Sequence, residues 1–408
     1  MARDFPRMRE LALVVAVAAA GCASGPAESG SHDPDQPPAH AADAAVPAST
    51  AAAIRVPLVP GLTVSTAIVM ESIGDGESVK QVMSVDGSQI RLRYSADVPD
   101  GGMGALAGGT PGQVRHVRGL RTIAREDLAS AREYMYIFGE GLPERIPGST
   151  SLGVSAAVLE DLKTRGESPL TLRGAGLGTA LNNLIGGFAG ADFKGLRELS
   201  GLDDIDRTAG TIHRVAGSPV SMRVLVNGVP RDLPAIHARG QFDENEGEFY
   251  FLDDADNPLA LKWSIGDDQL QVVSIVFPER VERAAPGRIE ADLASTGRAD
   301  VYGIYFDFDS ATIRPESAPV LEEIATAMRD HPDWSLSVEG HTDGIGAKDH
   351  NRELSMRRAT AVADALVRDF GIERGRLSPA GFGASRPRDT NDTVEGRARN
   401  RRVELVRR

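Results

Sequence analysis

An acid, an amide and a guanidinium lie close together near the C-terminus, where their types and spacing could bind a charged ligand. Asp343 lies in a loop before a helix expected over residues 348–370, and Asn351 and Arg358 lie on that helix. With about 100° of rotation per residue, Asn351 and Arg358 share one helix face, whereas Arg357 should face solvent. We therefore expect one acid and one guanidinium to meet at a pocket, with an amide between them.

The elements that must position these residues alternate along the C-terminal region. The helix face that carries Asn351 and Arg358 continues as Val362, Ala365 and Leu366, so its apolar half should pack on a sheet. Alternating strands and helices predict an α+β domain with helices on one sheet. The polar half of the helix then lies at the rim of that sheet. The expected strands cover residues 302–308, 336–339, 377–382 and 402–406, and the other expected helix covers residues 315–329.

Four short segments occur in order in this region. They are FDFDSATI at 306–313, EGHTDG at 339–344, NRELSMRRA at 351–359 and GRARNRRVE at 396–404. Together they make the chain from Tyr305 onward resemble the OmpA-like peptidoglycan-binding domain, which also occurs in peptidoglycan-associated lipoproteins and flagellar stator proteins. The resemblance covers about a quarter of the chain. It implies a βαβαβ-type domain that binds peptidoglycan without being an enzyme.

In that family the ligand is the diaminopimelate of the peptidoglycan stem peptide, whose side chain ends in an ammonium and a carboxylate. The resemblance assigns the ammonium to Asp343, the carboxylate to Arg358 and a supporting amide to Asn351. Opposite charges at a fixed separation suit a zwitterion, and a guanidinium pairs bidentately with a carboxylate where lysine would not. The alternative is an intramolecular salt bridge between Asp343 and Arg358, worth about 0–1 kcal/mol if exposed.

The resemblance adds three further residues to the expected peptidoglycan site. Asp309 matches a turn residue that lines the site, and Thr342 directly precedes Asp343 in the loop. Arg402 is expected to brace the site from the last strand, although an Arg-rich tail is more often a solvated face.

The N-terminus has the pattern of an export signal. Residues 1–21 combine a mildly basic start with an apolar run over 11–21, too short to span a bilayer. The small residues before Cys22 resemble the lipobox of bacterial lipoproteins, although the family prefers Leu where Ala19 stands. Two or three acyl chains on Cys22 would anchor the protein stably, and by resemblance the destination is the outer membrane. The alternative is signal cleavage without lipidation, which leaves a soluble periplasmic protein.

Composition divides the rest of the chain. Residues 22–53 are almost wholly small and polar, so they cannot fold and should form a tether behind the lipid anchor. Residues 54–285 have a strand-rich pattern that predicts a β-rich α+β domain of unknown role. Residues 286–299 are expected to be a linker, and residues 300–408 are the OmpA-like domain.

The central region predicts mainly antiparallel strands. A hairpin is expected where Asp86-Gly87-Ser88 separates 79–85 from 89–94. Helices are expected over 125–138 and 153–164. The uncharged, glycine-rich stretch 174–190 is best explained as a packed loop rather than a dinucleotide loop, because its glycines are spaced G-x-G-x-G. Further strands are expected at 62–70, 114–123, 170–173, 220–226, 248–252 and 269–277.

Composition also excludes several classes of function. The net charge of −13 argues against general nucleic-acid binding, and one cysteine rules out internal disulfides and Cys-based zinc sites. No hydrolase motif occurs, and the scattered histidines give neither a metal site nor a cofactor site. The sequence thus predicts a non-enzymatic link between outer membrane and peptidoglycan, whose central domain sets spacing or recruits another envelope protein. The alternatives are a central-domain hydrolase or assembly factor targeted by the C-terminal domain, and a stator component, which would need a spanning helix.

Overall fold

The computed structural model describes residues 55–69, 75–99, 114–136, 143–174, 207–266, 268–278 and 287–408. All of them belong to one compact unit, Ala52–Arg408. The expected signal peptide, Cys22, the tether and residues 175–190 lie outside the described residues. Within the described residues, no helix combines the length and apolarity needed to cross a bilayer.

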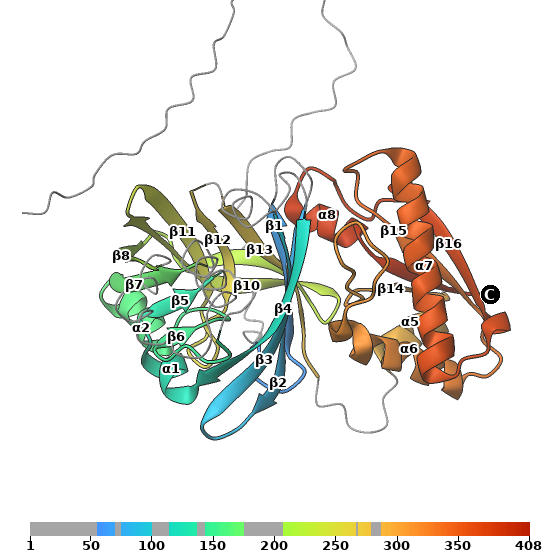
Figure 1. Cartoon of the computed structure of the whole chain (residues 1–408), viewed down its shortest axis with the longest axis horizontal. Helices are drawn as coiled ribbons and strands as arrows, with labels where there is room; N and C mark the ends of the chain where they lie inside the picture. The colour runs from blue at the N-terminus through green and yellow to red at the C-terminus, as the bar shows by residue number, and fades with distance from the viewer. Residues whose placement is uncertain are drawn as a thin grey trace, which may run out of the picture. The chain divides into compact units, whose positions relative to one another are not determined.

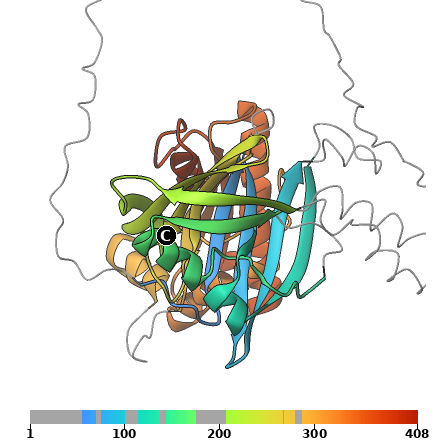
Figure 2. The same cartoon turned by 90° about the vertical axis from the view of Figure 1, so that its left-hand side faces the viewer.

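A large, mostly antiparallel sheet forms the central region (Figures 1 and 2), as the sequence predicts. Its strand order is β4-β3-β2-β1-β13-β12-β11-β10-β8-β7-β5-β6, and β9 pairs with both β10 and β13. The strands from β9 to β13 therefore close into a ring. The elements are β1 (Thr63–Val69), β2 (Gly76–Val85), β3 (Gln89–Pro99), β4 (Val114–Ala124), α1 (Arg125–Ser130), β5 (Glu133–Met135), β6 (Ser149–Thr150), α2 (Ala156–Thr164), β7 (Glu167–Arg173), β8 (Arg207–Arg214), β9 (Val220–Val226), β10 (Val229–Phe242), β11 (Asn245–Leu252), β12 (Ala260–Ile265) and β13 (Asp268–Val276).

The hairpin of β2 and β3 forms where the sequence predicts it. Asp86 Oδ1 accepts hydrogen bonds from the backbone N–H groups of Ser88, at 2.7 Å, and of Gln89, at 2.8 Å. This side chain satisfies the donors of the tight turn, which fixes the register of the two strands. Strands β2 and β3 of this hairpin, together with β1, contribute residues to the pocket described below.

The helix expected over 125–138 is wrong in its second half. Helix α1 ends at Ser130, and residues 133–135 form β5, which pairs in parallel with β6 and β7. Tyr134 and Met135 are fully buried on this strand. Burial of these two residues and strand pairing outweigh the helical pattern of the local sequence. The strands β8, β10 and β12 were not expected from the sequence.

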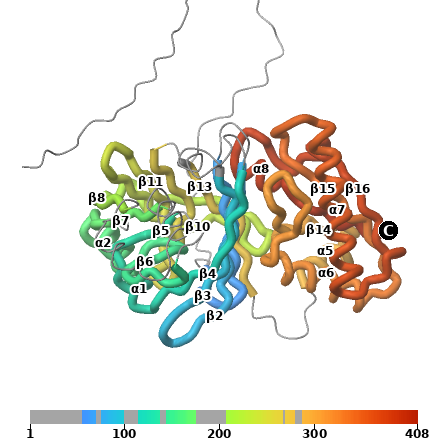
Figure 3. The backbone as a smooth tube through the Cα atoms, viewed as in Figure 1, coloured from blue at the N-terminus to red at the C-terminus, as the bar shows by residue number. Residues whose placement is uncertain are grey.

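The C-terminal region is a four-stranded sheet in the order β14-β17-β15-β16. Helix α7 lies along β15 and β16 (Figure 3), and its buried apolar residues share one core with those of α5 and α6. This confirms the predicted α+β arrangement. The elements are α5 (Arg288–Thr296), β14 (Arg298–Val301), a 3₁₀ turn η2 (Pro315–Ser317), α6 (Ala318–Asp330), β15 (Leu336–His341), α7 (Lys348–Phe370), a 3₁₀ turn η3 (Arg374–Arg376), β16 (Leu377–Gly383), α8 (Val394–Asn400) and β17 (Val403–Arg407).

Two expectations for this region need correction. Helix α5 occupies most of the stretch expected to be a linker, because Ile289 and Leu293 are buried one turn apart in the C-terminal core. The strand expected over 302–308 is instead β14 at Arg298–Val301, paired with β17. The chain leaves the sheet after Val301, and Gly303 has a φ of 107°, which favours glycine. Residues 302–308 are thereby free to line the site.

Candidate functional site

One pocket gathers the six peptidoglycan-site residues expected from the sequence. Its volume is about 300 Å³, at the lower end of the range for small-molecule sites. Helix α7, the loops before α7 and α6, and the approach to β17 bring these side chains to one rim of the C-terminal sheet. The six residues are Asp309, Thr342, Asp343, Asn351, Arg358 and Arg402.

Arg358 is a basic residue of the pocket that is positioned to bind a ligand anion. Its Nε donates to the backbone carbonyl of Ser310 at 2.9 Å, and its guanidinium lies 4.9 Å from the ring centroid of Phe306. Within the described residues, no carboxylate forms an ion pair with Arg358. Burial, helped by the nearby charge of Arg401, lowers the pKa of Arg358 to about 10, so it still carries its charge at neutral pH. The side chain is thus fixed in place and can accept an external anion.

Asp343 is held by its own loop and by a neighbouring arginine. Its Oδ1 accepts from the Ile345 backbone N–H at 3.0 Å, and its Oδ2 lies 2.7 Å from Arg401 Nη1. The partner of Asp343 is therefore Arg401, not Arg358, and the internal pair considered from the sequence does not form. Although burial acts in the opposite direction, the charge and hydrogen bond of Asp343 raise the pKa of Arg401.

The amide and hydroxyl beside Asp343 fix the shape of its loop. Asn351 Nδ2 donates to the carbonyls of Ile345, at 2.8 Å, and of Asp343, at 3.4 Å. Thr342 Oγ1 donates to the Asp343 carbonyl at 3.0 Å. Both side chains are buried. Asn351 therefore supports the position of the acid.

Asp309 and Arg402 also line the pocket, and each contacts other side chains of the protein. Asp309 has a φ of 48°, and its Oδ1 lies 2.6 Å from His350 Nε2. Arg402 is buried, with Nε 3.1 Å from Asp300 Oδ1 and Nη2 3.1 Å from Glu404 Oε2. Its guanidinium is satisfied within the protein, so its geometry is that of a brace behind the pocket.

Residues 305–401 match the OmpA family. These residues form an OmpA family domain. The match ends within the last segment that the sequence analysis singled out and includes the loop of Asp343 and the whole of α7.

Three curated relatives each match about a quarter of the chain. Outer membrane porin F of Pseudomonas aeruginosa is 46% identical over 101 residues, which are 25% of this chain and 29% of the porin. Probable lipoprotein YiaD of Escherichia coli is 39% identical over 103 residues, 25% of this chain and 47% of that protein. Peptidoglycan-binding protein ArfA of Mycobacterium tuberculosis is 38% identical over 117 residues, 28% of this chain and 36% of that protein. The chain thus spans less than half the length of each of these relatives.

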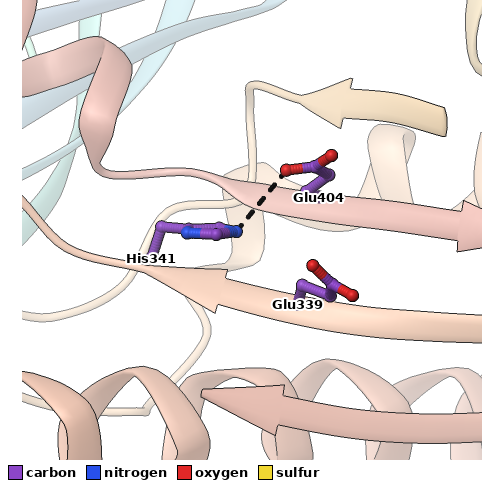
Figure 4. A group of neighbouring side chains, drawn as sticks. All are labelled: Glu339, His341 and Glu404. Atoms are coloured by element: carbon purple, nitrogen blue, oxygen red, sulfur yellow. Dashed lines mark ion pairs between the residues drawn. The ribbon is translucent and has the colours of Figure 1, made fainter. Parts of the chain in front are cut away.

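A buried group behind the OmpA family pocket has donor atoms suited to a cation. Glu339, His341 and Glu404 offer ligand atoms within 4.8 Å of one another (Figure 4). Glu404, however, accepts from Arg298 at 2.6 Å and also from Arg388 and Arg402, while Glu339 pairs with Arg386 at 3.2 Å. These guanidinium groups already neutralise the two carboxylates, so the donor set does not fit a metal ion.

His341 takes part in this group as a neutral ring. Burial and the charge of Arg402 lower its pKa to about 4, despite the opposing charge of Glu404. The ring stacks on Phe382 with centroids 5.5 Å apart. At neutral pH it therefore adds a polar but uncharged wall to the pocket.

The sequence analysis missed the pocket residues that come from the central sheet. Asp75 and Glu77 on or beside β2, and Asp97 on β3, line the pocket together with Ser65 on β1. The local sequence signal for these site residues is that they are acids in strands whose other residues are buried. The arginine partners of Asp75 and Asp97 lie more than 200 positions away, at Arg397 and Arg314.

Proposed function

We propose that this protein is an outer-membrane lipoprotein that binds peptidoglycan non-covalently through the diaminopimelate of the stem peptide. The observation that carries the proposal is Arg358, a fixed guanidinium that opens into the pocket and has no carboxylate partner among the described residues. A carboxylate of the ligand would complete it, with two parallel hydrogen bonds. Acidic groups on the other pocket walls would receive the ammonium.

Two further observations support the proposal. Much of the pocket lining belongs to the OmpA family domain, and one relative is named a peptidoglycan-binding protein, another an outer membrane porin and a third a probable lipoprotein. The apolar run before Cys22 resembles a lipidation signal, and the small, polar composition of residues 23–53 is that of a tether. Many such molecules, each with a weak contact, would join membrane and wall by avidity.

The test of wall binding is sedimentation of the full chain with purified insoluble peptidoglycan. We expect wild type to sediment, and Arg358→Ala to remain in solution with an unchanged unfolding midpoint. Arg357→Ala is the matched control, because Arg357 is exposed on the same helix and, in the part of the chain that the structure describes, its ion pair is the one with Glu353, at 3.8 Å. Equal sedimentation of all three proteins would contradict the proposal.

The test of the anchor is metabolic labelling with a radioactive fatty acid. Label is expected in wild type and not in Cys22→Ser, and the wild-type protein should fractionate with the outer membrane. Unlabelled wild type released into the periplasmic fraction would favour the alternative of a cleaved, unlipidated protein.

Lys80 is a residue of the central region whose pKa is shifted towards neutral pH, but its surroundings do not support the hydrolase alternative. Burial and the charge of Arg121 lower the pKa of Lys80 to about 7. Its Nζ, however, donates to the Ser151 carbonyl at 2.9 Å and lies 5.8 Å from the Trp263 ring, and the residue is only 4% exposed. An amine enclosed in this way cannot reach a cell-wall substrate.

A further inference from the structure

The wall of the pocket opposite α7 comes from the central sheet. Ser65, Asp75, Glu77 and Asp97 all line the same volume as Arg358. A family domain that makes up about a quarter of the chain thus shares its pocket with a second, unrelated part of the same chain.

Ion pairs fix this wall against the OmpA family domain. The Asp75 carboxylate accepts hydrogen bonds from Arg397 Nε, at 2.7 Å, and Arg397 Nη2, at 3.0 Å, and lies 3.4 Å from Arg401. Asp97 Oδ2 lies 2.6 Å from Arg314 Nη2, and both side chains are almost fully buried. A bidentate pair and a buried pair together hold β2 and β3 at the pocket.

Most charged side chains of the pocket are neutralised by these and similar pairs. Asp343 shares Arg401 with Asp75, and Asp309 pairs with His350. Arg402 pairs with Asp300 and Glu404, as described above. Among the described residues of the pocket, Glu77 and Arg358 form no ion pair, and the His350 partner of Asp309 is charged only when its ring is protonated.

Glu77 is held in place as firmly as Arg358. Its Oε1 accepts from Ser65 Oγ at 2.5 Å, its backbone N–H donates to Asp97 Oδ2 at 3.0 Å, and its carbonyl accepts from Arg314 at 3.1 Å. Burial lowers the pKa of Arg358, and the negative charge of Glu77 acts in the opposite direction. The charges of Glu77 and Arg358 therefore interact. One fixed anion and one fixed cation therefore remain in the same pocket.

We propose that Glu77, on the central sheet, is a specificity-determining residue of the peptidoglycan pocket that binds the ammonium of the diamino acid while Arg358 binds its carboxylate. This inference rests on the proposed function. In this proposal Glu77 attracts the ammonium of the ligand, because the charge of Asp343 is already balanced by Arg401. The central domain is then part of the binding site as well as a spacer.

The test uses the full chain and two soluble tripeptides, L-Ala-γ-D-Glu-meso-diaminopimelate and the same peptide acetylated on the free side-chain amine. Glu77→Gln keeps the shape and the acceptor for Ser65 but removes the charge. We expect it to weaken binding of the free amine about tenfold, as for loss of a hydrogen bond to a charged group. The acetylated peptide should bind wild type and Glu77→Gln equally.

Two further proteins separate the possible results. Glu160→Gln, an exposed acid on α2, should bind both peptides like wild type. Ser65→Ala leaves Glu77 charged but unrestrained, and should weaken binding of the free amine by a smaller factor, which tests the inference even if Glu77→Gln folds poorly. Unchanged affinity in both variants, with binding lost in Arg358→Ala, would overturn the role of Glu77 and leave the proposed function intact. Retained binding in Arg358→Ala would overturn the proposed function itself.

Discussion

Arg401 Nη1 lies 2.7 Å from Asp343 Oδ2, so the acid that the family resemblance assigns to a ligand ammonium already has a cation beside it. The same guanidinium nitrogen lies 3.4 Å from Asp75 Oδ2 in the central sheet. One arginine thus serves two carboxylates from distant parts of the chain. Its removal would leave the charge of Asp343 uncompensated, whereas Asp75 would keep its pair with Arg397.

Arg401→Gln should therefore destabilise the protein. We expect the free energy of unfolding to fall by about 2 kcal/mol, less than for a fully buried pair because the Arg401 side chain keeps 20% of its exposure. Urea unfolding of the full chain measures this change. Arg401→Lys, which restores the charge but not the fork, should recover part of the loss, whereas equal loss in both variants would contradict a charge effect.

Asp97→Asn should destabilise the protein more than Arg401→Gln does, because it weakens the contact between β3 and the OmpA family domain. Arg314 is completely buried and would keep only the longer, 3.4 Å contact of its Nε with Asp307, at a cost of about 3 kcal/mol. A double-mutant cycle with Arg314→Met isolates the pair, and the double variant should be more stable than Asp97→Asn alone. Additive losses would show that the two side chains do not act as a pair.

The contribution of Asp97 should also depend on pH. Burial raises the pKa of this carboxyl, but hydrogen bonds from His116 and Arg314 and the charge of Arg314 outweigh it, and the net pKa is lowered. A lowered pKa in the folded state gives stability that is present above the unfolded-state value, about 4. The difference between wild type and Asp97→Asn should accordingly shrink as the pH falls below about 4.

His341 should make stability pH-dependent in a higher range. Its pKa is about 4 in the folded protein against 6.5 for a free side chain, so the unfolded state binds more protons between these values. The contribution of His341 to the free energy of unfolding should be fully present above pH 6.5 and should fall by about 3 kcal/mol towards pH 4. His341→Phe, which can still stack on Phe382, should lose this component, as urea midpoints at several pH values would show.

Gly340 tests the packing of α7 on β15. A Cβ at this position would lie 2.2 Å from the Ser355 carbonyl, which belongs to the helix backbone and cannot move aside. Gly340→Ala should cost about 3 kcal/mol or more and displace the helix that carries Arg358. Gly375→Ala is the matched control, because nothing lies within 4 Å of its added Cβ. Similar thermal midpoints for the two variants would contradict the packing described here.

The half of the site on α7 could be predicted because its signals are local. The helix runs from Lys348 to Phe370 and ends at Gly371 in a left-handed conformation, as its periodicity and its glycine indicate. Asn351 and Arg358 share a face for the same geometrical reason. The loop of Asp343 could be placed because it directly precedes this helix.

The other half of the site could not be predicted, because it depends on contacts between distant residues. Asp97 and Arg314 are 217 positions apart, and nothing in the neighbourhood of either residue identifies its partner. The strand at 133–135 was missed for a related reason: its pairing with β7 outweighs local helical propensity. Long-range pairing decides such elements, and a single sequence does not display it.

Strand β1 is hydrogen-bonded along its length to β2 on one side and to β13 on the other. If the chain is anchored as proposed, tension between membrane and wall would enter the folded part just before this strand, and the component of that force along the strand axis would load both rows of hydrogen bonds. Because the hydrogen bonds of antiparallel strands run perpendicular to that axis, such a force would shear all of them at once rather than open them one by one. The protein would then resist mechanical extraction far better than a strand peeled from the edge of a sheet.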